Sequence, residues 1–123
     1  MDAQKYTQRS LQMIQDAQNI AIKNGNPELT DLHLHEALVT DSESLIARVL
    51  QEMNVDISQY RVTVDRAVEN LPKQQGASQI YPNAIFQRIL LKAEDEAKTL
   101  GDSYISVEHL YLSLISERQI PSE

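Results

Sequence analysis

The chain carries the same sequence pattern twice, and the second copy lies 76 positions after the first (Gly25 to Gly101). Residues 17–39 return as residues 93–115, so that His33-Leu34 matches His109-Leu110. Each copy predicts a helix with small residues on its inner face, a glycine that ends it, and a Thr or Ser that starts the next helix. A repeat of this kind favours stacked helical units with a shared core over a single catalytic centre.

The composition favours one compact, all-helical domain. The chain has 123 residues, of which 41% are hydrophobic and only 5% aromatic, and it has no tryptophan. Its core must therefore consist of Leu, Ile, Val, Ala and Met, whereas strands in sandwiches and barrels are usually rich in aromatic and β-branched residues.

The charge and the N-terminal sequence limit the classes of partner. The formal net charge is −7, and no cluster of Lys and Arg offsets it, so a nucleic acid is not an expected partner. The first residues lack the apolar run of a signal peptide, and no apolar run is long enough to span a bilayer. With no cysteine for disulfides or thiolate metal sites, we expect a soluble cytoplasmic protein with no membrane partner.

The first unit predicts four helices and the second unit predicts two. The four expected in the first unit cover about residues 7–24, 30–40, 42–53 and 56–71, and those of the second begin at about residues 83 and 106. The third helix has an expected inner face of Leu45, Ile46, Val49, Leu50 and Met53, and the fifth has one of Phe86, Leu90, Ala93, Ala97 and Leu100.

The length of the second unit predicts that it is truncated. Repeat one spans about residues 7–71, a linker covers about 72–82, and a partial repeat two occupies 83–123 of a single domain at 1–123. Under the repeat shift, the missing half of repeat two would occupy residues 116–147. We therefore expect a fragment of a longer protein.

The repeated histidines have two interpretations. His33 and His109 are equivalent, so they could form a symmetric metal site, or each could hydrogen-bond within its own helix–loop junction. The second interpretation is favoured, because no cysteine or close carboxylate pair completes a ligand set, and because His33 and His35 point to different helix faces. No nucleophile or phosphate-loop motif is present, so we expect no enzymatic activity.

The start of the fifth helix has more apolar residues than its core face needs. Ile85 and Ile89 lie beside the expected core stripe, and Tyr81 precedes the helix. The extra residues are explained either by core packing or by a shallow apolar groove open to partners.

Several segments carry a family resemblance. The segment 101–110, Gly-Asp-Ser-Tyr-Ile-Ser-Val-Glu-His-Leu, resembles the second repeat of Clp amino-terminal domains, and Lys5-Tyr6-Thr7-Gln8-Arg9, with Ala17-Gln18 and Ala21, resembles their first repeat. The stretches Asn70-Leu71-Pro72-Lys73 and Tyr81-Pro82 are most similar to those of ClpB, an AAA+ disaggregase chaperone of the stress response.

The resemblance implies a fold and a function. The implied fold is a double repeat of four-helix modules with pseudo-twofold symmetry. The implied function is capture of unfolded or aggregated polypeptide ahead of an ATPase ring, a hexamer in the parent protein. The domain itself would need no cofactor, since ATP and Mg would bind in the ATPase region.

The resemblance also implies a substrate-binding surface. Its polar part would consist of Thr7, Asp102 and Glu108, although these residues are equally suited to helix-cap and turn positions. Its apolar groove would lie near Ile85, Ile89 and Leu90.

One departure helps to choose within the family. ClpC-type domains bind phosphoarginine through a Glu that precedes the His of each repeat. Here Glu108 precedes His109, but Leu32 precedes His33, and Leu cannot accept guanidinium hydrogen bonds. ClpB-type capture is therefore favoured, and the alternative is an adaptor-docking domain of a ClpC- or ClpA-like unfoldase that feeds a protease.

Overall fold

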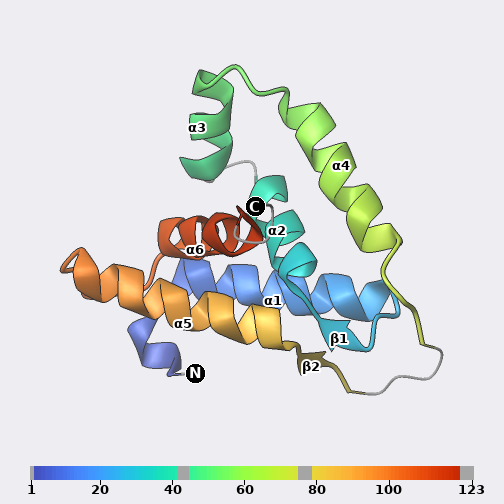
Figure 1. Cartoon of the computed structure of the whole chain (residues 1–123), viewed down its shortest axis with the longest axis horizontal. Helices are drawn as coiled ribbons and strands as arrows, with labels where there is room; N and C mark the ends of the chain where they lie inside the picture. The colour runs from blue at the N-terminus through green and yellow to red at the C-terminus, as the bar shows by residue number, and fades with distance from the viewer. Residues whose placement is uncertain (1, 42–44, 75–78, 120–123) are drawn as a thin grey trace.

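The structure, a computed structural model, describes residues 2–41, 45–74 and 79–119, and helices dominate this part of the chain (Figure 1). The elements in chain order are η1 (Ala3–Lys5), α1 (Gln8–Lys23), β1 (Glu28–Leu29), α2 (Asp31–Thr40), α3 (Leu45–Glu52), α4 (Ile57–Glu69), β2 (Tyr81–Pro82), α5 (Ala84–Thr99) and α6 (Val107–Gln119). The all-helical prediction is confirmed. Two strands of two residues each and one isolated bridge are the β-structure within the described ranges.

The residues expected to begin and end helices do so. The side chains of Thr7, Thr30 and Asp56 accept hydrogen bonds from backbone N–H groups in the first turns of α1, α2 and α4. Gly25 and Gly101 follow α1 and α5 with φ of +71° and +75°, a conformation that L side chains rarely adopt. The helix-ending role of both glycines therefore has a direct steric reason.

In each copy, the segment that precedes the first helix hydrogen-bonds to the other copy. The N–H of Thr7 donates to the carbonyl of Ile105 at 3.0 Å, and the N–H of Asn83 donates to the carbonyl of Leu29 at 2.9 Å. These are the same hydrogen bond shifted by the repeat length, since Thr7 corresponds to Asn83 and Leu29 to Ile105. α1 and α5 run in opposite directions (Figure 1), which fits a pseudo-twofold axis perpendicular to both helices.

The two short strands belong to these contacts between the copies. β1 and β2 pair in parallel, with Glu28 opposite Tyr81 and Leu29 opposite Pro82. The counterpart in the other copy is a single parallel bridge between Tyr6 and Ile105. We call residues 25–33 with 81–83 the first junction, and residues 101–109 with 5–7 the second junction.

The core lies where the two copies meet. α1 packs on α2, α5 packs on α6, and α2 also contacts α4 and α6. The largest apolar side chains with no exposed surface are Leu34, Leu38, Ile89, Leu110 and Leu114. Repeat-equivalent positions on α2 and α6 therefore supply most of the centre of one shared core.

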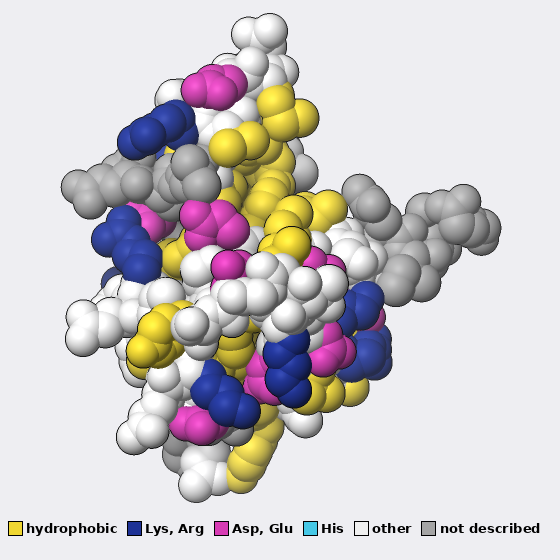
Figure 2. All heavy atoms as spheres, turned by 90° about the vertical axis from the view of Figure 1, so that its left-hand side faces the viewer, with side chains coloured by type: hydrophobic (Ala, Val, Ile, Leu, Met, Phe, Trp, Pro, Cys, Tyr) yellow, Lys and Arg dark blue, Asp and Glu magenta, His cyan; other side chains and the backbone are white. Residues whose placement is uncertain are grey.

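Two expectations about inward-facing residues are wrong. In α3, Ile46 and Leu50 are buried, but Val49 is 44% exposed, because this eight-residue helix contacts its neighbours along a narrow edge. Met53, expected on the same face, follows the end of α3 and is 65% exposed. Figure 2 shows hydrophobic side chains on the surface at the height of α3, above a lower region of mixed charges. Leu100 is 60% exposed, because it caps the end of α5 beyond the last packed turn.

Within residues 2–41, 45–74 and 79–119, no helix combines the length and the apolar character that crossing a membrane requires.

Candidate functional site

The histidine of the first junction fastens the turn to the start of α2. The N–H of Thr30 donates to Nδ1 of His33 at 2.9 Å, which completes a reciprocal cap in which histidine replaces the more common Glu or Gln. Since Nδ1 accepts from a backbone N–H, the proton of the neutral ring resides on Nε2, which donates to Oδ1 of Asn26 at 2.8 Å. Both ring nitrogens are therefore engaged inside the junction.

The histidine of the second junction makes the same pair of hydrogen bonds. The N–H of Ser106 donates to Nδ1 of His109 at 2.9 Å, and Nε2 of His109 contacts Oδ2 of Asp102 at 2.9 Å. The interpretation that each histidine secures its own helix–loop junction is confirmed. The symmetric metal site is not formed, since all four ring nitrogens bind protein groups, and no cluster of three His, Cys, Asp or Glu suited to a metal exists among the described residues.

Burial keeps His33 neutral. The ring has no exposed surface, and this desolvation lowers the pKa of His33 to about 4, although the carboxylate of Asp31 opposes the shift. A proton on Nδ1 would also displace the hydrogen bond from Thr30. His33 is therefore a structural residue at neutral pH.

Asp102 carries a charge that its junction does not require. The repeat-equivalent residue in the first junction is Asn26, whose neutral amide oxygen accepts the same hydrogen bond from the histidine. The side chain of Asp102 is 50% exposed, whereas Asn26 as a residue is only 2% exposed. An acceptor alone satisfies the fold, so the negative charge at Asp102 is available to a partner.

Thr7 and Glu108 belong to the same junction as Asp102. Thr7 caps α1, where its Oγ1 accepts from the N–H of Ser10 at 3.1 Å, and its backbone binds Ile105 of the second junction. Glu108 is exposed in the first turn of α6, directly before His109. The structure thus brings the three predicted polar residues to one junction.

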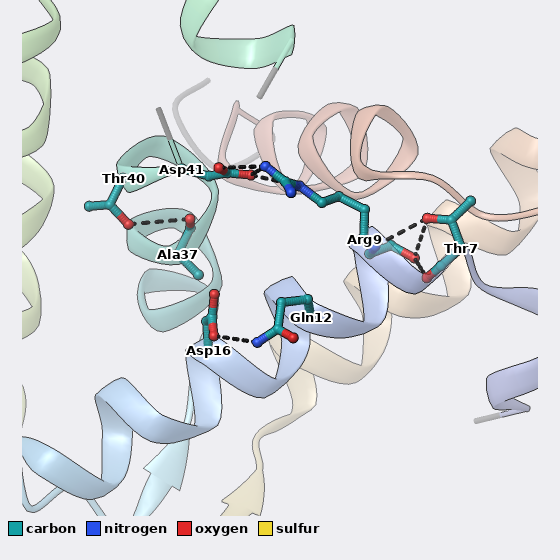
Figure 3. Close-up of polar contacts among 8 residues, drawn as sticks. Thr7, Arg9, Gln12, Asp16, Ala37, Thr40 and Asp41 are labelled. Atoms are coloured by element: carbon teal, nitrogen blue, oxygen red, sulfur yellow. Dashed lines mark hydrogen bonds and ion pairs between the residues drawn. The ribbon is translucent and has the colours of Figure 1, made fainter. Parts of the chain in front are cut away.

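An ion pair holds the helix start that carries Thr7. Figure 3 shows Arg9 reaching from the first turn of α1 to Asp41 at the end of α2. Arg9 Nη2 lies 2.7 Å from Asp41 Oδ1, and Nε lies 3.0 Å from Oδ2, which is the bidentate geometry of a guanidinium–carboxylate pair. This contact ties α1 to α2 close to the second junction.

The predicted apolar residues lie elsewhere, and one of them was assigned wrongly. Ile85 is 36% exposed and Leu90 packs at the edge of the core, but Ile89 has no exposed surface. The core face of α5 uses Phe86, Ile89, Ala93 and Ala97, so Ile89 takes the inward place expected for Leu90. A fully buried side chain cannot line an open groove. Ile89 is a core residue.

The polar and apolar predictions therefore do not form one cluster. Ile85 lies in the first turn of α5, and Asp102 follows the end of that helix. A helix of 16 residues is about 24 Å long, so the two parts are separated by about that distance.

Sequence reasoning missed the apolar residue of the second junction. Tyr104 is 57% exposed and lines a cavity of about 190 Å³ together with Asp102. The other lining residues are Lys5, Glu94, Ala97, Lys98, Ser103 and Ile105. Only the structure identifies this residue: Ile105 is buried in the bridge to Tyr6, and in extended backbone the preceding side chain points the opposite way.

Comparison with known proteins identifies the arrangement. The sequence profile of the Clp repeat (R) N-terminal domain matches residues 5–122. The chain belongs to the Clp repeat N-terminal domain family. The family model describes a non-catalytic N-terminal domain, in agreement with the prediction that this chain is not an enzyme.

Curated relatives are chaperone proteins named ClpB. The chain is 39% identical over 122 residues to ClpB of Clostridium tetani and 34% identical over 121 residues to ClpB of Nitratidesulfovibrio vulgaris. These alignments cover 96% and 95% of this chain, but only 14% of either relative. The chain therefore spans about one seventh of the length of these relatives.

Solved structures confirm the fold at low sequence identity. The N-terminal domain of Hsp104 from Candida albicans superposes with a TM-score of 0.88 at 21% identity, covering 94% of this chain and 77% of that one. The N-terminal domain of the ClpV1 ATPase from E. coli gives a TM-score of 0.85 at 15% identity, covering 95% and 71%.

Proposed function

We propose that this domain captures unfolded or aggregated polypeptide for a ClpB-like, ATP-dependent protein disaggregase, and that the second junction is its capturing surface. The observation that carries the proposal is the surplus charge of Asp102. The first junction makes the same hydrogen bonds with the neutral residue Asn26, so the fold gives no reason for a carboxylate at this exposed position.

The surroundings of Asp102 suit a polypeptide ligand. Glu108 adds a second exposed carboxylate, and Tyr104 adds an exposed aromatic ring next to the cavity. Carboxylates can bind Lys, Arg and backbone N–H groups, and a tyrosine ring can contact apolar side chains as well as cations. A small surface of this kind supports weak, reversible binding, which a domain that must release its client requires.

We propose that the capturing surface also includes Ile85 and Leu90 on α5. An extended polypeptide covers about 3.3 Å per residue, so a segment of about seven residues would span the distance from the second junction to Ile85. Unfolded clients expose such segments and folded ones do not. Ile89 is not part of this surface, because it is fully buried.

The test replaces the two carboxylates with the residues of the first junction. An Asp102→Asn/Glu108→Leu variant copies Asn26 and Leu32, so it should fold. We expect fluorescently labelled casein and a disordered peptide rich in Lys and Leu to bind this variant about tenfold more weakly in fluorescence anisotropy.

A matched control removes the same number of charges elsewhere. Asp95 and Glu96 are exposed on α5, so an Asp95→Asn/Glu96→Gln variant has the same net charge as the test variant. This control should bind like the native domain. Native-like binding by the test variant, or equal losses in both variants, would refute the second junction as the capturing surface.

A further inference from the structure

The first junction contains a larger cavity than the second. It has a volume of about 480 Å³ and is lined by Asn26, Pro27, Glu28, Thr30, Leu71, Pro72 and Tyr81. It lies where the segment after α4 passes the β1–β2 pair, at the end of the molecule opposite the tip of α5 (Figure 1). This volume falls within the range of pockets that hold small ligands or single large side chains.

The exposed wall of this cavity is apolar. Pro27, Leu71 and Pro72 contribute aliphatic surface, and the ring of Tyr81 is 63% exposed. The polar groups of Asn26 are already used: Oδ1 accepts from His33, and Nδ2 donates to the carbonyl of Pro72 at 2.8 Å. A ligand therefore meets hydrocarbon and an aromatic ring.

The walls are held in place before any ligand binds. The bond from Asn26 to Pro72 fixes the segment after α4 against the junction, and the N–H of Gln74 donates to the carbonyl of Gly25 at 2.8 Å. Pro27 and Pro72 have restricted backbone conformations. A preformed pocket loses little entropy on binding, which favours a real site over a gap in packing.

The charge of the rim defines the ligand. Glu28 is exposed and is the one charged residue among those that line the cavity. A Lys or Arg next to the bound apolar side chain would be attracted by this carboxylate and by the face of Tyr81, whereas an acidic neighbour would be repelled. The net charge of −7 acts in the same direction.

We infer that the first junction is a second polypeptide-binding site, which takes a large apolar side chain of an unfolded segment that has a Lys or Arg beside it. The repeat-equivalent residues in the second junction differ: Ser103 replaces Pro27, Tyr104 replaces Glu28, and Lys5 replaces Tyr81. The two junctions thus present different side chains to a polypeptide. The choice of polypeptide as ligand rests on the proposed function, while the pocket itself does not.

The absence of tryptophan from the chain allows a direct test. A short capped peptide with a central Trp-Lys pair is titrated with the full chain, and the tryptophan emission is recorded with excitation that spares tyrosine. We expect a blue shift on binding, and a Trp-Glu peptide of the same length should bind about tenfold more weakly.

Two variants locate the site. Tyr81→Ser should weaken binding of the Trp-Lys peptide about tenfold, and Glu28→Gln should reduce the preference for Trp-Lys over Trp-Glu. Met53→Ser is the matched control, since Met53 is a similarly exposed large side chain that follows α3 and belongs to neither junction. It should leave peptide binding unchanged. Circular dichroism verifies that each variant is folded, and Glu28→Gln keeps the test decisive if Tyr81→Ser unfolds the domain.

The outcomes separate the two proposals. Native-like affinity of the peptide for Tyr81→Ser, or an unchanged Lys preference in Glu28→Gln, overturns the first-junction site. If the Asp102→Asn/Glu108→Leu variant binds casein normally while Tyr81→Ser loses the peptide, the second-junction proposal fails and the first-junction site stands.

Discussion

The two junctions of this domain share a hydrogen-bonded framework and differ in the chemistry of their surfaces. In both, a backbone N–H at the start of a helix donates to Nδ1 of a histidine, and Nε2 of that histidine contacts the residue after the glycine. That residue is the buried Asn26 in one copy and the half-exposed Asp102 in the other. The framework is constrained by the fold, and the surface is free to diverge.

The cause of the difference is the segment after α4. This segment covers the first junction, where the carbonyl of Pro72 accepts a hydrogen bond from the side-chain amide of Asn26. For Asp102, the structure gives His109 as the side-chain partner. Burial thus excludes a charge from the first junction, whereas solvent exposure permits one in the second junction.

The largest expected effect comes from removing each histidine. His33→Ala should lower the free energy of unfolding by about 3 kcal/mol, because it leaves a cavity and deprives the buried N–H of Thr30 of its partner. His109→Ala should cost about 1 kcal/mol less, since water can reach Asp102. Urea unfolding monitored by circular dichroism measures both, and equal costs would show that the covering segment does not matter.

A smaller effect should follow from exchanging the residues after the glycines. Asn26→Asp should cost about 2 kcal/mol, because a carboxylate cannot donate to the carbonyl of Pro72 and would be buried beside it. Asp102→Asn should change stability by less than about 0.5 kcal/mol. Thermal unfolding of the two single variants would test this asymmetry, and a large cost for Asp102→Asn would mean that its charge supports the fold.

The smallest effect is the dependence of stability on pH. The pKa of His33 is lowered to about 4, so between pH 6.5 and 4 the unfolded chain binds a proton that the folded chain does not, and stability falls as the pH falls. Glu36 on α2 acts in the opposite direction. Burial, then the nearby Asp65 and Glu69 of α4, raises its pKa to about 6, so stability falls as the pH rises from 4.5 to 6.

Variants separate these two opposing contributions. In Glu36→Gln, acidification from pH 6.5 to 4.5 should lower the melting temperature more steeply than in the native domain. In His33→Ala, the melting temperature should instead rise over the same range, if that variant remains folded. Parallel profiles for Glu36→Gln and the native domain would show that the α2–α4 contact does not hold a protonated Glu36.

The sequence predicted the framework because its determinants are local. Caps such as Thr7 and Thr30, the glycines at positive φ, and the histidines three residues after Thr30 and Ser106 act within a few residues of one another. Their repetition then gave the relation between the two copies. The candidate polar residues Thr7, Asp102 and Glu108 came from the family resemblance and not from these local patterns, and only the fold joined Thr7 to the other two, through Ile105.

The apolar part of the site could not be predicted, because helical periodicity does not determine which neighbour a helix meets. Ile89 and Leu90 are adjacent on α5, and both fit an apolar face. Packing against α6 and the other copy buried Ile89 completely and left Leu90 at the edge. The same uncertainty placed Val49 and Met53 wrongly on the inner side of α3.

The sequence by itself determined the helices, their ends and the duplicated hydrogen-bonded junctions, since short-range steric and hydrogen-bonding preferences encode them. The tertiary structure decided which side chains remain exposed, since exposure depends on contacts between segments far apart in the chain. The segment after α4 illustrates this, because it covers Asn26 and forms a pocket with Tyr81. Asp102, the repeat equivalent of Asn26, remains exposed to a partner.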